Sequence, residues 1–229
     1  MVTTKKGIRV RIVLADHQHL VRHGLRCYLE QSKQYDVVGE TADSATLPAL
    51  LARLKPDVVL VDFELTPLNG PDVARVIRER FPRTAVVVLS RYENETHAVQ
   101  SLRNGASAYV TKAAQPRELW RAIKTASNGG HYVSSPLAYR PMSYWLHRAE
   151  RGAVDSYDAL GTREREVLHL VSQGLSSTGI GRRLGISART VETHRERVKE
   201  KLGIRNLAGL VRYAVERQLF GLAGRRRGS

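Results

Sequence analysis

Four polar residues of the chain, Asp16, Asp62, Ser90 and Lys112, are of the types that perform phosphoryl transfer. A carboxylate such as that of Asp62 can accept a phosphoryl group, while a hydroxyl and an ammonium group bind the phosphoryl oxygens. A further carboxylate can hold a divalent cation that offsets the negative charge. Each of the four follows an apolar run. This shared placement predicts that they form one site, rather than being unrelated polar residues that each happen to follow a strand.

Apolar segments with the character of strands must position these residues. They cover residues 9–15, 36–39, 58–61, 85–89 and 108–111. Helical stretches near 20–30, 45–54, 73–80, 96–103 and 116–127 follow them in turn. This alternation predicts an α/β fold, a doubly wound five-stranded parallel sheet of the flavodoxin-like kind. The carboxyl ends of such strands form a crevice, where we expect the four polar residues.

A second pattern, over residues 184–194, joins a short helix to a longer and more charged one through Gly185. A glycine turn lets two helices cross at a steep angle, and Ser187 can cap the second helix by accepting a hydrogen bond from a backbone N–H. The size and spacing of this unit suit insertion into the major groove of DNA.

The second helix has an apolar and a polar face, at about 100° per residue. Val191, Val198 and Leu202 share the apolar face, with His194 and Arg195 beside them. The polar face carries Arg189, Thr193, Glu196, Arg197 and Glu200, with Glu192 at its edge. We expect DNA contacts on the polar face, although an ordinary charged surface helix shows a similar pattern.

The whole chain carries a formal net charge of +15 and has a pI of about 10.4. This charge favours nucleic acid as a partner, with an anionic membrane as the competing one. Residues 158–229 contain 15 Lys and Arg against 7 Asp and Glu, and residues 1–157 contain 22 against 15. The excess is therefore shared by both halves, and charge alone does not select a DNA sequence.

Length, apolar runs and cysteine content favour a cytoplasmic protein of two domains. A chain of 229 residues exceeds a typical single domain. No apolar run approaches the roughly 20 residues that span a bilayer, and residues 1–11 lack the apolar core of a signal peptide. The single cysteine, Cys27, cannot form an internal disulfide, and we expect a buried, inert thiol in a helix.

Residues 160–219 resemble the four-helix DNA-binding domain of the LuxR/FixJ class of bacterial regulators. The resemblance is carried by Leu160-Gly-Thr-Arg-Glu-Arg-Glu-Val-Leu168, the turn at Gly174, Thr190-Val-Glu-Thr-His194 and Lys201-Leu-Gly203. It implies an all-α four-helix helix-turn-helix domain, in which Thr190 and His194 support the recognition helix. The predicted DNA-contacting residues are Arg189, Thr190, Glu192, Thr193, Glu196 and Arg197.

The fourth helix of this domain, about 207–218, mediates dimerisation in the family. The predicted contact residues are Leu207, Leu210, Val211 and Ala214, although part of that face must pack within its own domain. Two features depart from the family: acids stand at 192 and 196, where some relatives carry lysine, and Gly179 and Gly181 weaken the scaffold helix. The acids leave the preferred DNA sequence open.

Residues 8–128 resemble the receiver domain of two-component response regulators. The resemblance implies that Asp62 is the phosphoacceptor, Asp16 the first acid of the magnesium pocket and Lys112 the phosphate-binding lysine. In the same way, Ser90 matches the switch hydroxyl, Tyr109 the aromatic switch position, and Gly70 the glycine eight residues after the acceptor. Together the two resemblances imply a DNA-binding transcriptional response regulator of the NarL/FixJ type, not an enzyme. The implied partners are double-stranded DNA, a second copy of the chain and a sensor histidine kinase.

The match to the receiver family breaks at residue 17. Receivers usually carry two adjacent acids after the first strand, but here His17 replaces the second acid, which is ordinarily a direct metal ligand. Magnesium prefers hard oxygen ligands in near-octahedral geometry, so imidazole is a poor substitute. Asp16 and Asp62 remain as predicted metal ligands, and we expect Mg²⁺ binding to be weakened or lost.

Two alternatives to a phosphorylated regulator stay open. The first is a pseudo-receiver transcription factor that is controlled by a partner, a ligand or dimerisation without phosphorylation. The second, more remote, is an aspartate-dependent phosphatase, because Asp62-Phe-Glu-Leu-Thr66 resembles the catalytic loop of haloacid-dehalogenase-like enzymes with Glu64 in place of the second Asp. That loop usually follows the first strand of its domain, whereas here it follows the third.

The predicted domains are a receiver over residues 1–128, a linker over 129–157 and a DNA-binding domain over 158–229. Glycines and prolines in the linker disfavour one continuous helix, but residues 142–151 can form a short one that carries Tyr144 and Trp145. These aromatic residues pack between the domains, at a dimer contact or in a small local cluster; the sequence leaves all three open.

Overall fold

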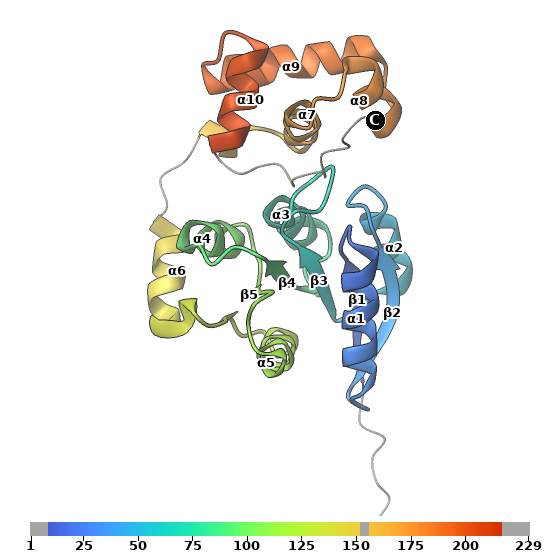
Figure 1. The fold of residues 1–229 in the computed structure, drawn as a ribbon, viewed down its shortest axis with the longest axis vertical. Helices are drawn as coiled ribbons and strands as arrows, with labels where there is room; N and C mark the ends of the chain where they lie inside the picture. Colours follow the sequence, from blue (N-terminus) through green and yellow to red (C-terminus); the bar gives the residue numbers. More distant parts are fainter. Residues whose placement is uncertain (1–8, 152–155, 217–229) are drawn as a thin grey trace, which may run out of the picture.

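The protein consists of an α/β part followed by a helical part, as the computed structural model in Figure 1 shows for residues 9–151 and 156–216. The strands of the α/β part are β1 (Val10–Ala15), β2 (Tyr35–Thr41), β3 (Val58–Asp62), β4 (Ala85–Ser90), β5 (Ala108–Thr111) and β6 (Tyr132–Val133). They form one parallel sheet in the order β2-β1-β3-β4-β5-β6. The predicted doubly wound parallel fold is confirmed.

Helices cover both faces of this sheet. The helices are α1 (His19–Glu30), α2 (Leu47–Leu54), α3 (Gly70–Arg80), α4 (Glu95–Arg103) and α5 (Pro116–Ser127). Alternate residues of β1 point to opposite faces: Val13 lies in a core with α2, α3 and α4, and Ile12 in a core with α1 and α5. Apolar side chains on both faces are typical of a parallel sheet that is buried on both sides.

The sheet has a sixth strand that the sequence did not predict. Tyr132 and Val133 pair in parallel with Ala108 and Tyr109 of β5, immediately after the Gly129-Gly130 turn. Two residues are too few for an alternating pattern to be recognised, so only the pairing with β5 identifies this strand.

The segment between the two parts folds onto α4. After the 3-10 helix η1 (Leu137–Tyr139), α6 (Met142–Arg151) forms as predicted and places Trp145, with 0% exposure, in the core of the α/β part. Glu95 at the start of α4 accepts hydrogen bonds from Tyr144 and Arg148, both at 3.2 Å. The aromatic residues of α6 therefore anchor this segment to the α/β part. The boundaries at 128 and 157 remain predictions.

The helical part has its own core. It contains η2 (Ser156–Ala159), α7 (Thr162–Ser172), α8 (Ser177–Leu184), α9 (Ala188–Leu202) and α10 (Leu207–Glu216), which agrees with the predicted four-helix domain. Each of the four α-helices contributes buried side chains to this core, among them Leu168, Ile180, Val191 and Leu210. In Figure 1, α7 lies between α9 and α3, so α9 is on the side turned away from the sheet. Among the described residues, no helix is long and apolar enough to cross a membrane.

The prediction for Cys27 is wrong. The residue lies on α1 as expected, but its side chain is exposed. The apolar face of α1 is instead supplied by Leu25, Tyr28 and Leu29, because Cys27 falls on the opposite side of the helix.

Candidate phosphorylation pocket and nucleic-acid interface

The four polar residues predicted to act together lie at the carboxyl edge of the sheet. Asp16 follows β1, Asp62 ends β3, Ser90 ends β4 and Lys112 follows β5. Asp16, Asp62 and Ser90 are at most 2% exposed. The ammonium group of Lys112 lies 2.8 Å from Asp16 Oδ2 and 2.9 Å from Asp62 Oδ1. One ammonium group thus contacts both buried carboxylates of the pocket.

His17 completes the charge balance of this pocket. Its Nδ1 lies 2.7 Å from Asp62 Oδ2, so both oxygens of Asp62 are engaged, one by Lys112 and one by His17. The hydrogen bond to Asp62 raises the pKa of His17 against the opposing effect of burial. Burial disfavours the charged form of Asp62, but His17 and Lys112 together lower the pKa of this carboxyl below its ordinary value.

The pocket is a poor match to Mg²⁺. One ligand atom from each of Asp16, His17 and Asp62 lies within 4.8 Å of the others, as a metal site would need. However, one of the three is an imidazole nitrogen, and the two carboxylates already bind Lys112. Because Mg²⁺ prefers oxygen ligands and near-ideal octahedral geometry, the donor set does not suit this ion.

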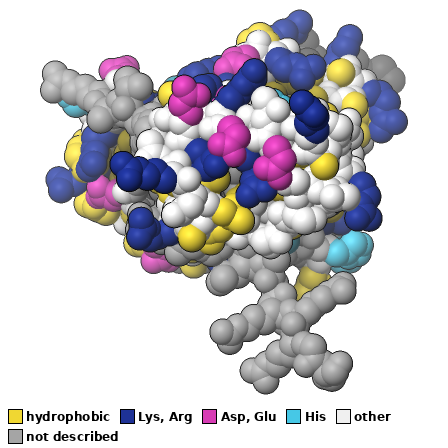
Figure 2. Space-filling model, turned by 90° about the horizontal axis from the view of Figure 1, so that it is seen from above, with side chains coloured by type: hydrophobic (Ala, Val, Ile, Leu, Met, Phe, Trp, Pro, Cys, Tyr) yellow, Lys and Arg dark blue, Asp and Glu magenta, His cyan; other side chains and the backbone are white. Residues whose placement is uncertain are grey.

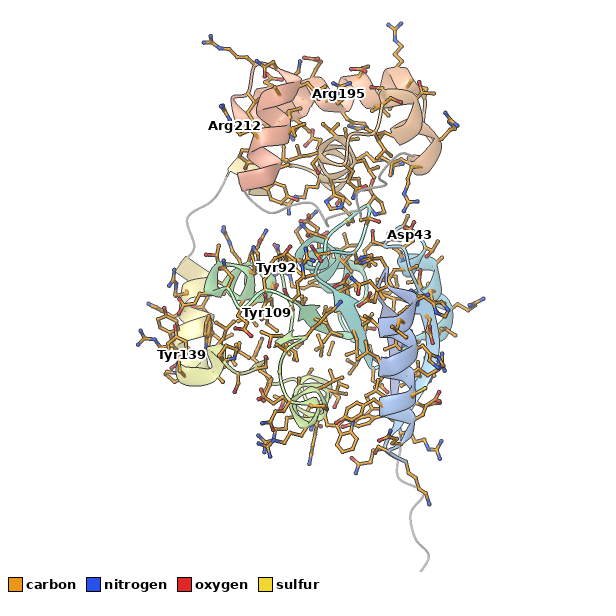
Figure 3. The ribbon with its side chains drawn as sticks, viewed as in Figure 1. Asp43, Tyr92, Tyr109, Tyr139, Arg195 and Arg212 are labelled. Carbon is orange, nitrogen blue, oxygen red and sulfur yellow. The ribbon has the colours of Figure 1, made fainter. Side chains whose placement is uncertain are left out.

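The loop after β4 is bound by both predicted switch residues. Ser90 Oγ accepts a hydrogen bond from the backbone N–H of Tyr92 at 3.0 Å, and Tyr109 Oη donates to the backbone oxygen of Tyr92 at 2.7 Å. Figure 3 shows Tyr92 and Tyr109 near each other beside α4. Tyr109 is 0% exposed, and burial raises the pKa of its hydroxyl. The ring of Tyr109 therefore points into the protein, and its hydroxyl holds the loop after β4 through the hydrogen bond to Tyr92.

A further residue of the pocket, Glu64, was assigned no role in the receiver interpretation. It is 7% exposed, and its Oε1 lies 2.9 Å from both Arg91 Nη2 and Tyr92 Oη. Glu64 thus ties the loop after β3 to the loop after β4. The signal for it in the sequence is its place two residues after Asp62, which the phosphatase alternative used. Its carboxylate is bound to neighbours here, and this gives that alternative no support.

Gly70 brings the start of α3 against the backbone of the pocket. A Cβ atom at this position would lie 2.9 Å from the carbonyl oxygen of Asp62 and 2.9 Å from Phe63 Cα, which is closer than side chains tolerate. The N–H of Gly70 donates to the backbone oxygen of Phe63 at 2.9 Å. Glycine at the predicted spacing from Asp62 is therefore required by packing.

The predicted DNA-binding residues all lie on the exposed face of the helical part. Arg189, Thr190, Glu192, Thr193, Glu196 and Arg197 are exposed on α9, whereas Val191 and Val198 are buried. Figure 2, which views this end of the molecule, shows acidic side chains lying among basic ones. The face therefore combines both signs of charge.

Glu192 is held by neighbouring side chains rather than projecting freely. Its Oε1 accepts from Ser177 Oγ of α8 and from Arg195 Nη1, the latter at 2.9 Å. By contrast, the side chain of Glu196 is 67% exposed, and within the described residues it pairs with Lys199 at 2.7 Å. To contact a base, Glu192 would first have to leave Ser177 and Arg195.

The turn between α8 and α9 agrees with the predicted helix-turn-helix geometry. Gly185 has a φ of 67°, and Ser187 Oγ accepts from the N–H of Thr190 at 3.0 Å, as expected of a cap. A Cβ atom at Gly181 would lie 2.6 Å from the backbone oxygen of Ile186. Glycine at 181 therefore permits the close crossing, and its cost in helix propensity has a structural reason.

The structure corrects the predicted dimer contact on α10. Leu210 and Ala214 are 1% and 0% exposed because they pack in the core of the helical part. Leu207 is 48% exposed and Val211 is half-buried. Leu210 and Ala214 are therefore core residues, and of the four predicted contact residues Leu207 and Val211 keep apolar surface that a second copy could cover.

Comparison with known proteins agrees with both units. The family model "Response regulator receiver domain" matches residues 12–124, and "Bacterial regulatory proteins, luxR family" matches residues 158–214. The chain is 34% identical to the transcriptional regulatory protein MctR of Rhizobium johnstonii over 216 residues, which are 94% of this chain and 98% of MctR. The chain belongs to the response regulators that carry a LuxR-type DNA-binding domain.

Solved structures of this family include complexes with DNA. A structure of RcsB from Salmonella enterica serovar Typhimurium bound to promoter P1flhDC with the phosphomimetic BeF₃⁻ has a TM-score of 0.57 and 26% identity, over 91% of this chain and 99% of RcsB. A structure of two RcsB dimers bound to two parallel DNAs has a TM-score of 0.54 and 26% identity, over 90% and 98%. This response regulator is thus a DNA-binding transcriptional regulator by family, and the matched families are not enzyme families.

Proposed function

We propose that this response regulator controls transcription through phosphorylation of Asp62. The observation that supports the proposal is the contact of Lys112 with both Asp62 and Asp16 in a buried crevice at the carboxyl edge of the sheet. When a phosphoryl group is bound there, Lys112 would leave Asp62 Oδ1 and bind the phosphoryl oxygens instead. The Ser90 hydroxyl, at the end of the adjacent strand β4, would be a second ligand for these oxygens.

The reaction is a displacement at phosphorus. An oxygen of Asp62 attacks the phosphoryl group of a kinase phosphohistidine or of a small acyl phosphate and forms a new P–O bond. The P–N or P–O bond to the donor breaks, and its electron pair leaves with the donor group, either as a histidine imidazole that takes up a proton or as a free carboxylate. Lys112 stabilises the added negative charge, and His17 must give up its hydrogen bond to one carboxylate oxygen.

We further propose that His17 makes this phosphorylation weakly dependent on Mg²⁺. The proposal is supported by the poor donor set and by the position of His17, 2.7 Å from Asp62. When bound, Mg²⁺ offsets the negative charge of the carboxylates and phosphoryl oxygens, and Asp16 and Asp62 would be its ligands. Here part of that compensation comes from the imidazole and Lys112.

Labelling of Asp62 tests this function directly. Wild type, His17→Asp and Asp62→Asn are incubated with a small acyl phosphate, with and without Mg²⁺, and the added phosphoryl mass is measured on the intact chain. We expect slow labelling of wild type with little effect of Mg²⁺, faster Mg²⁺-dependent labelling of His17→Asp, and none of Asp62→Asn. Fast, Mg²⁺-dependent labelling of wild type would contradict the altered pocket and restore the ordinary mechanism.

A second candidate function is a pseudo-receiver regulator that is controlled without phosphate. The observation in its favour is that both oxygens of Asp62 are already engaged, by Lys112 and His17. If neither wild type nor His17→Asp is labelled while both still bind DNA, this candidate replaces the first.

We propose that the chain binds a symmetric DNA site as a homodimer. Support comes from the exposed face of α9 and from RcsB, which forms dimers on DNA. Selection of the full chain from random duplexes should enrich paired half-sites about one helical turn apart, with affinity that falls as salt rises. Enrichment no better than that of an unrelated basic protein would contradict sequence-specific binding.

A further inference from the structure

A buried group of three residues joins the α/β part to the helical part. Asp72 on α3 accepts through Oδ1 from Arg165 Nη1 of α7, and through Oδ2 from Tyr157 Oη at 2.6 Å. The guanidinium of Arg165 also lies 4.6 Å from the ring centre of Tyr157. We call Asp72, Arg165 and Tyr157 the Asp72 cluster. Each of its members is at most 2% exposed.

Two outer contacts lie beside the Asp72 cluster. Arg75 Nη2 donates to Thr162 Oγ1 at 3.0 Å, from α3 to the first turn of α7. Arg183 of α8 lies 2.8 Å from Asp43 Oδ2, and Asp43 belongs to the loop between β2 and α2 (Figure 3). The helical part thus contacts the carboxyl edge of the sheet, the edge that carries the Asp62 pocket.

The Asp72 cluster is shielded from solvent only while the two parts are in contact. Separation of the parts would return the carboxylate and the guanidinium to water, so the net gain from this ion pair is small. Its strict geometry matters more: Arg165 Nε also donates to the backbone oxygen of Leu160 at 2.9 Å, which fixes the direction of the guanidinium. A pair of this kind specifies one orientation of the helical part, since a misplaced partner leaves a buried charge uncompensated.

The Asp72 cluster is also next to the Asp62 pocket along the chain and in space. Asp72 is in the first turn of α3, where its backbone N–H donates to the Asn69 side chain at 2.9 Å. Two residues earlier, Gly70 is packed against the backbone of Asp62 and Phe63 with no room for a side chain. A shift of the loop after Asp62 would therefore be passed to Asp72 through the start of α3.

The recognition helix is not covered in this arrangement. Arg189, Thr193 and Glu196 are exposed on α9. The helix itself lies on the side of the helical part that is turned away from the sheet (Figure 1). The contact between the parts therefore leaves the exposed residues of α9 accessible to DNA.

We propose that the Asp72 cluster holds the helical part in one orientation and couples this orientation to the state of Asp62 through the start of α3. The first half of the proposal stands on the contacts alone. The coupling to Asp62 rests on the proposed function, that is, on phosphorylation of this residue.

Distance measurements between two spin labels test the orientation. The single native cysteine, Cys27 on α1, is exposed and takes one label, and Arg205→Cys in the exposed turn before α10 takes the other. With the cluster intact, we expect one narrow distance distribution by pulsed double electron–electron resonance. Asp72→Asn and Arg165→Gln should each shift the opening equilibrium by roughly 100-fold or more and broaden the distribution.

Matched variants keep this test decisive. Asp36→Asn removes an exposed carboxylate from β2 and should leave the distribution narrow. The double variant Asp72→Asn/Arg165→Gln should broaden the distribution no more than either single variant, because both remove the same interaction. Tyr157→Phe, which removes one hydrogen bond and keeps the ring, covers the case in which Asp72→Asn fails to fold. A distribution that stays narrow in all folded cluster variants overturns the proposal.

Phosphorylation tests the coupling. Wild type labelled at Asp62 by a small acyl phosphate should show the broadened distances of Asp72→Asn. By reciprocity, a cluster variant should be easier to phosphorylate at equilibrium by the same factor. Labelling of Asp62 with unchanged distances would overturn the coupling and leave a fixed contact between the parts. Absence of label would instead refute the proposed function and the coupling together, while the spin-label distances still decide the orientation.

Discussion

At the residue scale, His97 is a buried histidine that packs against Phe63 and Tyr92, in the loops after β3 and β4. It is 5% exposed, its ring stacks on Phe63 with centres 4.5 Å apart, and burial lowers its pKa to about 4. In the unfolded chain the pKa is about 6.5, so between these values the unfolded state binds a proton that folded His97 does not. The stability that depends on neutral His97 is complete above about pH 6.5 and falls as the pH is lowered towards 4.

The size of this effect follows from the two pKa values. The loss should reach about 3 kcal/mol across the window, at ~1.4 kcal/mol per pH unit. Urea unfolding of wild type and His97→Phe at several pH values between 7 and 4 measures it, and the variant should show the shallower decline. His17, whose pKa is raised, acts in the opposite direction, but it is present in both proteins and cancels in the comparison. Equal slopes for the two proteins would show that His97 is not the group responsible.

At the scale of single elements, we expect base reading and phosphate binding to be divided between two adjacent residues of α9. Glu196→Gln should change the preferred bases, with about 1–3 kcal/mol less discrimination for cytosine, because a carboxylate accepts from the cytosine amino group. Arg197→Ala should weaken binding to all sequences alike and reduce the salt slope by about 1. Binding of selected and scrambled duplexes at several salt concentrations distinguishes the two. A uniform loss in Glu196→Gln would refute its role in reading.

On α10, we expect substitution of one residue to affect mainly folding and substitution of its neighbour to affect mainly assembly of the dimer on DNA. Leu210→Ala removes a buried side chain and should destabilise the helical part by about 2–5 kcal/mol. Val211→Glu should cost the helical part less stability, because Val211 is only half-buried against the same core, and should weaken occupancy of paired half-sites together with the exposed surface of Leu207. Thermal unfolding and cooperativity on paired sites provide the two readouts. Unchanged cooperativity in folded Val211→Glu would exclude this surface as the dimer contact.

At the scale of the whole molecule, two separate cores should respond separately to mutation. Trp145 of α6 is wholly buried in the core of the α/β part, whereas the helical part packs around Leu168 and Ile180. Trp145→Ala should cost the α/β part about 3–5 kcal/mol. Hydrogen exchange should therefore speed up in the strands and remain nearly unchanged in the centre of α7. Equal loss of protection in both parts would mean that they unfold as one unit.

Much of the fold and of the pocket was predictable from local patterns. Apolar runs that end in Asp62, Ser90 or the residue before Lys112 define parallel strands, and parallel strands bring their carboxyl ends to one edge. Gly185 and Ser187 likewise define the helix-turn-helix turn, because left-handed backbone and capping are properties of a few neighbouring residues. These features depend on contacts that are near in sequence or repeated along an element.

Only the tertiary structure decided which polar groups meet across elements. Asp72 and Arg165 are ordinary charged residues of two amphipathic helices, and nothing in the spacing of either helix indicates that they pair. The same is true of Glu192 with Ser177, and of Glu64 with Arg91. Packing also assigned Leu210 to the core and Cys27 to the surface. The physical reason is that a helical or strand period specifies which face a side chain is on, while its partner depends on how distant segments pack together.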